Sequence, residues 1–234
     1  MPVPEFRECT GSSIFSTSHR RLAPGGKSGK PACAAMQPRR GSKPAVGKAY
    51  AMFKSILSFG RRPNRHVTDA IYEAIVAAAR QPHFYSQWEV PDTPLGRFEM
   101  LSLHMVLVLE RTSGGPAALG DLAQDLTDEF FKDVDHSLRE LGIGDISMPK
   151  RMKKLARMFY GRAEAYRSAV IAGDEAALAT ALARNIQPQA EWPHAAALAA
   201  YTLGASAMLA SQADAALLAG QIAFPPAEET KVTP

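Results

Sequence analysis

The sequence predicts an all-α protein, a single compact domain of about six or seven helices that follows a disordered N-terminal tail. Three observations predict it. Apolar side chains recur every three or four residues through most of the chain after residue 66, as they do in amphipathic helices. Glycine and proline separate these stretches, where helices end and begin. Residues 1–48 show no such period and are rich in Gly, Ser, Pro and Arg, so they cannot bury enough apolar surface to fold.

The basic charge of the chain lies in this tail, which we expect to cover residues 1–51. The whole chain carries a net charge of +4 and residues 1–48 carry +7, which leaves −3 for residues 49–234. A uniformly basic nucleic-acid-binding domain is therefore disfavoured. Both cysteines, Cys9 and Cys33, also lie in the tail, so no disulfide framework supports the domain, which fits a reducing compartment.

Two origins of the tail remain open. Its Arg- and Ser-rich, acid-poor composition is typical of a targeting segment, but its prolines and glycines break an amphipathic helix. Met52 is an alternative start, which would make residues 1–51 an upstream extension of the gene, and we favour this origin.

The first three predicted helices cover 67–80, 95–111 and 118–141. In the first, Val67, Ile71 and Ile75 share one face. Prolines then bound an irregular aromatic segment, 83–88. The helix at 95–111 is apolar nearly all round, so it should be central, and the helix at 118–141 ends before Gly142.

The remaining helices are predicted over 149–172, 175–185 and 194–220. Proline suits the first position of a helix and glycine its far end, as at Pro149 and Gly173. The segment 194–220 is long enough to span a bilayer, but it is rich in alanine and only weakly apolar, so we expect close helix packing and no transmembrane helix. We expect 52–222 to form the helical domain and 223–234 to be disordered.

One face of the helix at 149–172 is the first candidate for partner binding. At about 100° per residue, Phe159 and Tyr166 lie in its apolar stripe, and four cations lie opposite: Lys150, Lys153, Lys154 and Arg157. These cations lie at the positive end of the helix dipole, where each costs roughly 0.3–1 kcal/mol. No acid between 149 and 162 offsets that cost. A solvated helix face explains charge opposite an apolar stripe, but the adverse placement favours a contact surface.

The aromatic segment is the second candidate, through Phe84, Tyr85 and Trp88. Its side chains either pack over the core as a lid or contact a partner. Large aromatic residues are usually buried at least in part, which favours the lid.

A line of polar residues follows the inner helices, at Arg97, His104, Glu129, Asp133 and His136. Because an unpaired carboxylate near the apolar stripe would be costly, we predict a structural ion-pair network. In it, Arg97 or an arginine of the 149–172 helix would meet Asp133 or Glu129.

The sequence names no catalytic residue, metal ligand set or cofactor. His-Glu-x-x-His and Gly-x-Ser-x-Gly are missing, and the only Glu-x-x-His string, 191–194, is interrupted by a proline. We therefore expect no enzyme, and a metal-dependent helical enzyme built on Asp133 and His136 is the weakest alternative.

Two stretches carry a family resemblance: WEVPDTPLGRFEMLSLHMVLVLER and DLTDEFFKDVDHSLRELGIGDISMPKRMKKLARMFYGR. They resemble the ubiquinol–cytochrome c chaperone family, from about residue 52 to about residue 220. The resemblance implies an assembly chaperone for respiratory complex III, which binds newly made cytochrome b or an early assembly intermediate, with a small helical partner protein and close to the ribosome.

The resemblance also implies a place in the cytoplasm, peripheral to the inner membrane, or in the mitochondrial matrix of a eukaryote. The alternative from the residues alone is a helical adaptor. Such an adaptor would bind ribosomal RNA or an anionic membrane surface through the basic patch.

Overall fold

The computed structural model describes residues 64–229 of the chain. The predicted tail, 1–51, lies outside the described residues. Along the part that is described, the chain forms, in order, α2 (Arg65–Ala79), α3 (Pro82–Ser86), α4 (Pro94–Thr112), α5 (Ala117–Glu140), α6 (Met148–Ala172), α7 (Glu175–Ile186), α8 (Ala195–Ser211), α9 (Asp214–Leu218) and the short 3₁₀ helix η2 (Ala227–Glu229). Residues 64–229 contain no β-strand, which confirms the predicted fold class.

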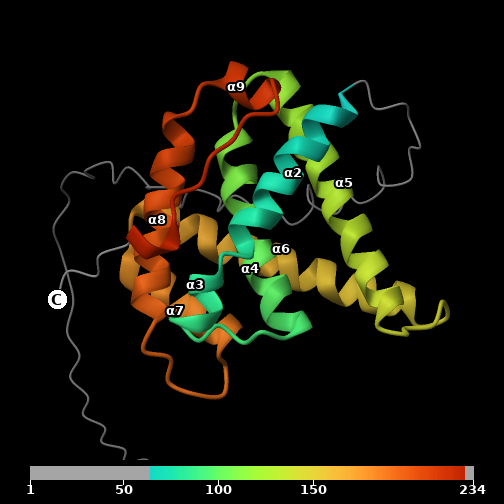
Figure 1. The fold of residues 1–234 in the computed structure, drawn as a ribbon, viewed down its shortest axis with the longest axis vertical. Coiled ribbons are helices and arrows are strands. Elements are labelled where there is room, and N and C mark those ends of the chain that lie inside the picture. The colour runs from blue at the N-terminus through green and yellow to red at the C-terminus, as the bar shows by residue number, and fades with distance from the viewer. Residues whose placement is uncertain (1–63, 230–234) are drawn as a thin grey trace, which may run out of the picture. The chain divides into compact units, whose positions relative to one another are not determined.

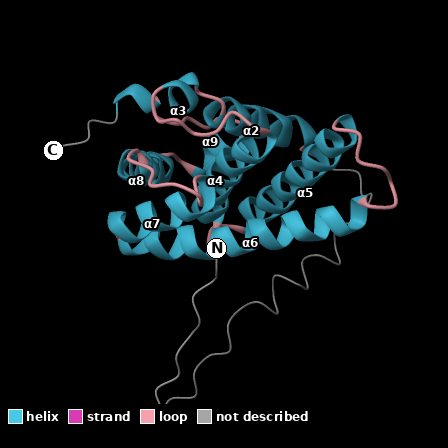
Figure 2. Cartoon of the chain, turned by 90° about the horizontal axis from the view of Figure 1, so that it is seen from below, coloured by secondary structure: helices cyan, strands magenta, loops and turns pink. Residues whose placement is uncertain are grey.

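The helix α4 forms the centre of the fold, as its all-round apolar sequence predicts. It contacts α2, α5, α6, α7 and α8 (Figure 1, Figure 2). Where α4, α5 and α6 meet, the rings of Phe98, Phe130 and Phe159 pack against one another in tilted pairs, with centroids 6.0 Å apart for the first pair and 4.9 Å for the second. This aromatic junction fixes α6 against the core, so the direction of each face of α6 is set.

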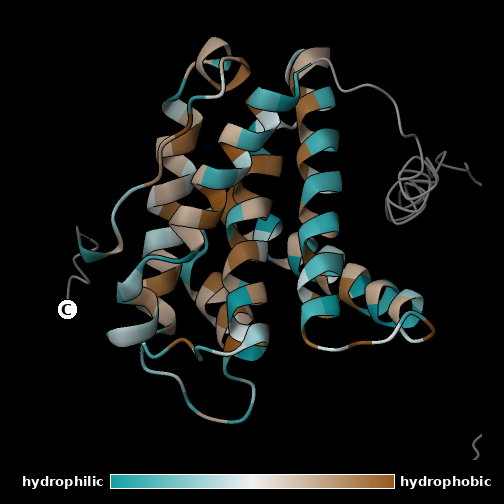
Figure 3. Ribbon diagram, turned by 45° about the vertical axis from the view of Figure 1, so that its right-hand side comes forward, coloured by the Kyte–Doolittle hydropathy of each residue, from teal (hydrophilic) through white to brown (hydrophobic). Residues whose placement is uncertain are grey.

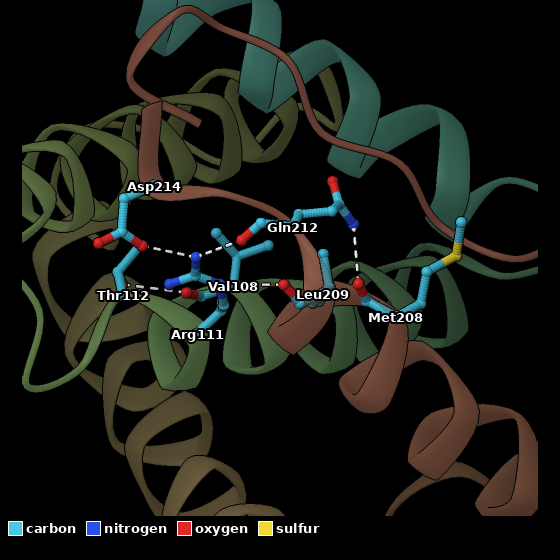
Figure 4. Close-up of polar contacts among 7 residues, drawn as sticks. All are labelled: Val108, Arg111, Thr112, Met208, Leu209, Gln212 and Asp214. Carbon is cyan, nitrogen blue, oxygen red and sulfur yellow. Dashed lines mark hydrogen bonds and ion pairs between the residues drawn. The ribbon is translucent and has the colours of Figure 1, made fainter. Parts of the chain in front are cut away.

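The predicted helix 194–220 is wrong in one respect, because it is two helices. The chain is extended at Gln212 and Ala213, between α8 and α9. Arg111, at the end of α4, holds this break: its Nε donates to the Leu209 carbonyl at 2.9 Å, and its Nη2 donates to the Gln212 carbonyl and the Asp214 carboxylate, both at 2.6 Å (Figure 4). One guanidinium therefore binds two carbonyls at the break, of Leu209 and Gln212, and joins them to the Asp214 carboxylate at the start of α9.

The close packing predicted for the alanine-rich helix is confirmed for α8. Ala199 and Ala205 are fully buried, and α8 packs along α7. No helix in residues 64–229 combines the length and the apolar character that a bilayer crossing requires.

The C-terminal segment is ordered up to η2, which corrects the predicted disorder for residues 223–229. The Gln81 side chain holds it, since its Nε2 donates to the Pro225 carbonyl at 3.2 Å and its Oε1 accepts from the Ala227 amide at 2.7 Å. The Gln212 side chain holds the same segment, since its Nε2 donates to the Ala223 carbonyl and its Oε1 accepts from the Ala223 amide, each at 2.9 Å. These contacts come from α2 and from the end of α8, so local sequence could not show them.

The turn between α5 and α6 begins with a glycine stop, as predicted. Gly142 has φ 78°, its amide donates to the Arg139 carbonyl, and the next amide, of Ile143, donates to the Leu138 carbonyl. This pair of bonds is a Schellman motif, which requires the left-handed backbone that glycine adopts at no steric cost.

We expect Gly142→Ala to lower the free energy of unfolding by about 1–2 kcal/mol, because the left-handed conformation costs an L side chain about that much. Gly144→Ala is the matched control in the same turn, since a Cβ at either position meets nothing within 4 Å and only Gly142 has a positive φ. Thermal unfolding compares the two variants. Equal losses would contradict the conformational explanation.

Candidate partner-binding surface

The candidate cations lie on the outer face of α6. Phe159 and Tyr166 on the opposite face are buried to within 1% of complete, and this packing turns the other face outward. All four predicted residues are exposed: Lys150, Lys153, Lys154 and Arg157. None of them makes an ion pair with another residue of the described chain. Their exposure is therefore observed, whereas their binding of a partner stays a prediction.

The start of α6 does nothing to offset these charges. Ser147 precedes the helix but makes no side-chain cap; its hydroxyl donates instead to the Gly144 carbonyl at 3.0 Å. The first turn contains no acidic residue. Cations thus remain beside unsatisfied amide groups at the positive end of the dipole.

The aromatic segment packs over the core as a lid, and its two buried rings, Phe84 and Trp88, are not accessible to a partner. It contains the short helix α3, where an irregular segment was predicted. Phe84 and Trp88 are buried, their rings 5.5 Å apart, and the Trp192 indole donates to the Trp88 carbonyl at 2.8 Å. Tyr85 is half-buried and donates to the Ala79 carbonyl. The prediction of Phe84 and Trp88 as contact residues is wrong because both pack into the core.

The predicted polar network is also wrong, since its members have separate partners. Arg97 pairs with Asp92 at 2.6 Å at the surface. Asp133 accepts from the Tyr72 hydroxyl at 2.9 Å, because α2 packs over that side of α5. The other members have these partners: Glu129 pairs with Lys132 at 2.7 Å, His136 pairs with Glu140 at 3.2 Å, and His104 bonds Met100 and Tyr201.

The buried ion pair of the fold joins α4 and α6 instead. Arg162 of α6 pairs with Glu99 of α4, and both side chains are at least nine-tenths buried. Burial raises the pKa of Glu99 to about 7, against the opposing charge of Arg162. An arginine of this helix was predicted to meet Asp133 or Glu129, whereas Arg162 meets Glu99. A charge inside each apolar stripe is the signal that could have identified the pair.

His104 lies among aromatic rings and does not join the line of polar residues predicted along the inner helices. His104 Nδ1 donates to the Met100 carbonyl at 2.8 Å, and its Nε2 accepts from the Tyr201 hydroxyl at 3.0 Å. Burial lowers the pKa of His104 to about 4. The side chain is therefore neutral at physiological pH and serves the packing of α4 against α8.

No candidate metal site comes together in residues 64–229. Nowhere in that range do three or more His, Cys, Asp or Glu side chains converge as metal ligands, and Asp133 and His136 have the separate partners given above. A hollow of about 370 Å³ lies between α2 and the C-terminal segment, lined by apolar side chains and Gln81. The most distinctive chemistry of the described surface is therefore the cationic face of α6.

The fold and this surface define an all-α protein with an aromatic core and an exposed cationic helix face. The model of the ubiquinol-cytochrome C chaperone family matches residues 86–224, and the chain belongs to that family. Among solved structures, it is similar to the crystal structure of the Cbp3 homolog from Brucella abortus. The two are 52% identical, the match covers 80% of this chain and 99% of the other, and the TM-score is 0.69. No curated protein matches the chain.

Proposed function

We propose that this protein is an assembly chaperone for respiratory complex III, ubiquinol–cytochrome c reductase, and that it binds newly made cytochrome b or an early assembly intermediate. The observation that carries the proposal is the family match over residues 86–224, supported by 52% identity with the Cbp3 homolog from Brucella abortus. The role is one of binding and delivery, and it needs neither a cofactor nor a metal ion.

The cationic face of α6 is the surface that we assign to contact at the site of assembly. Its four side chains are exposed and have no carboxylate partner among the described residues, so an external anion can reach them without displacing an internal pair. Such a contact would be sensitive to salt because exposed charges are screened. A small helical partner protein and the nearby ribosome belong to the same proposal.

Deletion of the gene tests the proposed function. We expect loss of the heme b absorbance of cytochrome b and loss of ubiquinol–cytochrome c reductase activity in membranes, with both restored by the wild-type gene on a plasmid. Succinate dehydrogenase activity in the same membranes is the control, because it does not require complex III. Normal heme b and normal reductase activity in the deletion strain would refute the proposal.

A further inference from the structure

The turn between α5 and α6 exposes two large aliphatic side chains. Ile146 is 101% exposed and Leu141 is 58% exposed. Isolated apolar side chains are normal on a protein surface, but these two share one seven-residue turn, 141–147, between two long helices. Figure 1 and Figure 2 place this turn at the opposite end of α6 from α7, with no other described helix beside it.

The charge on the α6 side of the turn is mainly positive, and the acid on its α5 side, Glu140, pairs with His136. Residues 141–160 contain five cations, Lys150, Arg151, Lys153, Lys154 and Arg157, and one acid, Asp145. Asp145 is already paired with Arg139 at the end of α5. Four of the cations fall within an arc of about 100° on the helix. An aliphatic tip therefore lies beside a cationic helix face, and Figure 3 shows hydrophobic and hydrophilic positions next to each other in this hairpin.

We propose that this α5–α6 tip, residues 141–157, docks the protein on the surface of an anionic phospholipid bilayer. Cations near the surface bind anionic headgroups, and aliphatic side chains enter the boundary between headgroups and acyl chains. The proposal rests on the proposed function, in which the cationic face of α6 makes contact at the site of assembly, and it names the partner of that face.

A nucleic acid fits the same tip less well. Proteins that bind single strands without sequence preference combine cations with aromatic side chains on which bases stack. The nearest aromatic residues of α6 are Phe159, which is buried, and Tyr160, which is half-buried against the ring of Phe131. The exposed apolar residues at the tip are aliphatic. The pattern therefore favours a lipid surface over RNA.

Flotation of the full-length protein with vesicles tests the proposal, using phosphatidylcholine alone and phosphatidylcholine mixed with phosphatidylglycerol. We expect flotation only with the anionic vesicles. Lys150→Gln with Lys154→Gln should weaken partitioning about 30-fold, since each cation contributes about fivefold. Ile146→Ser should weaken it about tenfold, because the aliphatic contact is lost.

The matched controls remove the same groups elsewhere. Ile171→Ser replaces an aliphatic side chain, 63% exposed, at the far end of α6. Arg65→Gln with Arg184→Gln removes two exposed cations from α2 and α7. We expect both controls to float as the wild type does. Flotation of the Ile146→Ser protein at the wild-type level, or equal losses in the controls, would overturn the proposal.

Binding to polyuridylate distinguishes RNA as the partner. A protein that does not float with anionic vesicles but binds polyuridylate through Lys150 and Lys154 would also overturn the proposal. The failure of this inference can be told from failure of the proposed function. Lost reductase activity on gene deletion without vesicle binding refutes the inference alone, whereas tip-dependent vesicle binding with normal reductase activity refutes the proposed function alone.

Discussion

Replacement of Arg162 by alanine should lower the free energy of unfolding by about 3–5 kcal/mol, because it leaves the Glu99 carboxylate buried without its partner. Glu99 is 1% exposed and lies in the middle of the core between α4 and α6. With the guanidinium gone, the pKa of Glu99 should rise further, since Arg162 is the charge that opposes the effect of burial. Urea denaturation followed by far-UV circular dichroism measures the loss.

A second ion pair between the same two helices provides the control. Arg167 of α6 pairs with Glu110 of α4, but its side chain is 49% exposed. We expect Arg167→Ala to cost at most about 1 kcal/mol, as exposed pairs do. Replacing both Glu99 and Arg162 by leucine should recover most of the loss, because no charge is then left buried alone. Equal costs for Arg162→Ala and Arg167→Ala would contradict burial as the cause.

Local patterns in the sequence predicted most of the fold. The all-round apolar run marked α4 as central, and the glycines at 142 and 173 stand where α5 and α6 end. The break between α8 and α9 escaped prediction because its cause, Arg111, lies 98 residues before Leu209. The alanine-rich stretch 194–220 favours a helix throughout, and its own sequence does not show that a distant arginine accommodates a break.

The outward direction of the cationic face of α6 was also predictable from the sequence. The helical period placed Lys150 and Arg157 opposite the buried stripe, and the structure exposes both. The partners of buried polar groups could not be predicted, because they depend on which helix packs on which. Asp133 meets Tyr72 since α2 covers α5 there. The exposed Ile146 was missed because a turn has no period from which exposure can be read.

Acid should destabilise this protein through His104, which is fully buried with its ring between Phe84, Tyr201 and Phe224. Burial lowers its pKa from 6.5 to about 4, so the unfolded chain binds a proton in this window that the folded chain does not. The contribution of His104 to stability is present above pH 6.5 and is lost as the pH falls through 4. The shift corresponds to about 3 kcal/mol.

Glu99 acts in the opposite direction over an overlapping window. Burial raises its pKa from 4.5 to about 7, so its contribution is present below pH 4.5 and is lost as the pH rises through 7. In the pH profile of the wild-type free energy of unfolding, the two contributions therefore cancel in part. Difference profiles separate them: the free energy of unfolding of the wild type minus that of each single variant, His104→Gln or Glu99→Gln, at pH values from 4 to 7.

The two differences should have opposite slopes. Glutamine at position 104 is neutral at every pH and can still donate to the Met100 carbonyl and accept from Tyr201, so the His104 difference should decrease by about 3 kcal/mol as the pH falls from 6.5 to 4. The Glu99 difference should instead decrease as the pH rises. A His104 difference that is constant with pH would mean that the ring gains its proton in the folded protein as easily as in the unfolded chain, which complete burial among aromatic rings makes unfavourable.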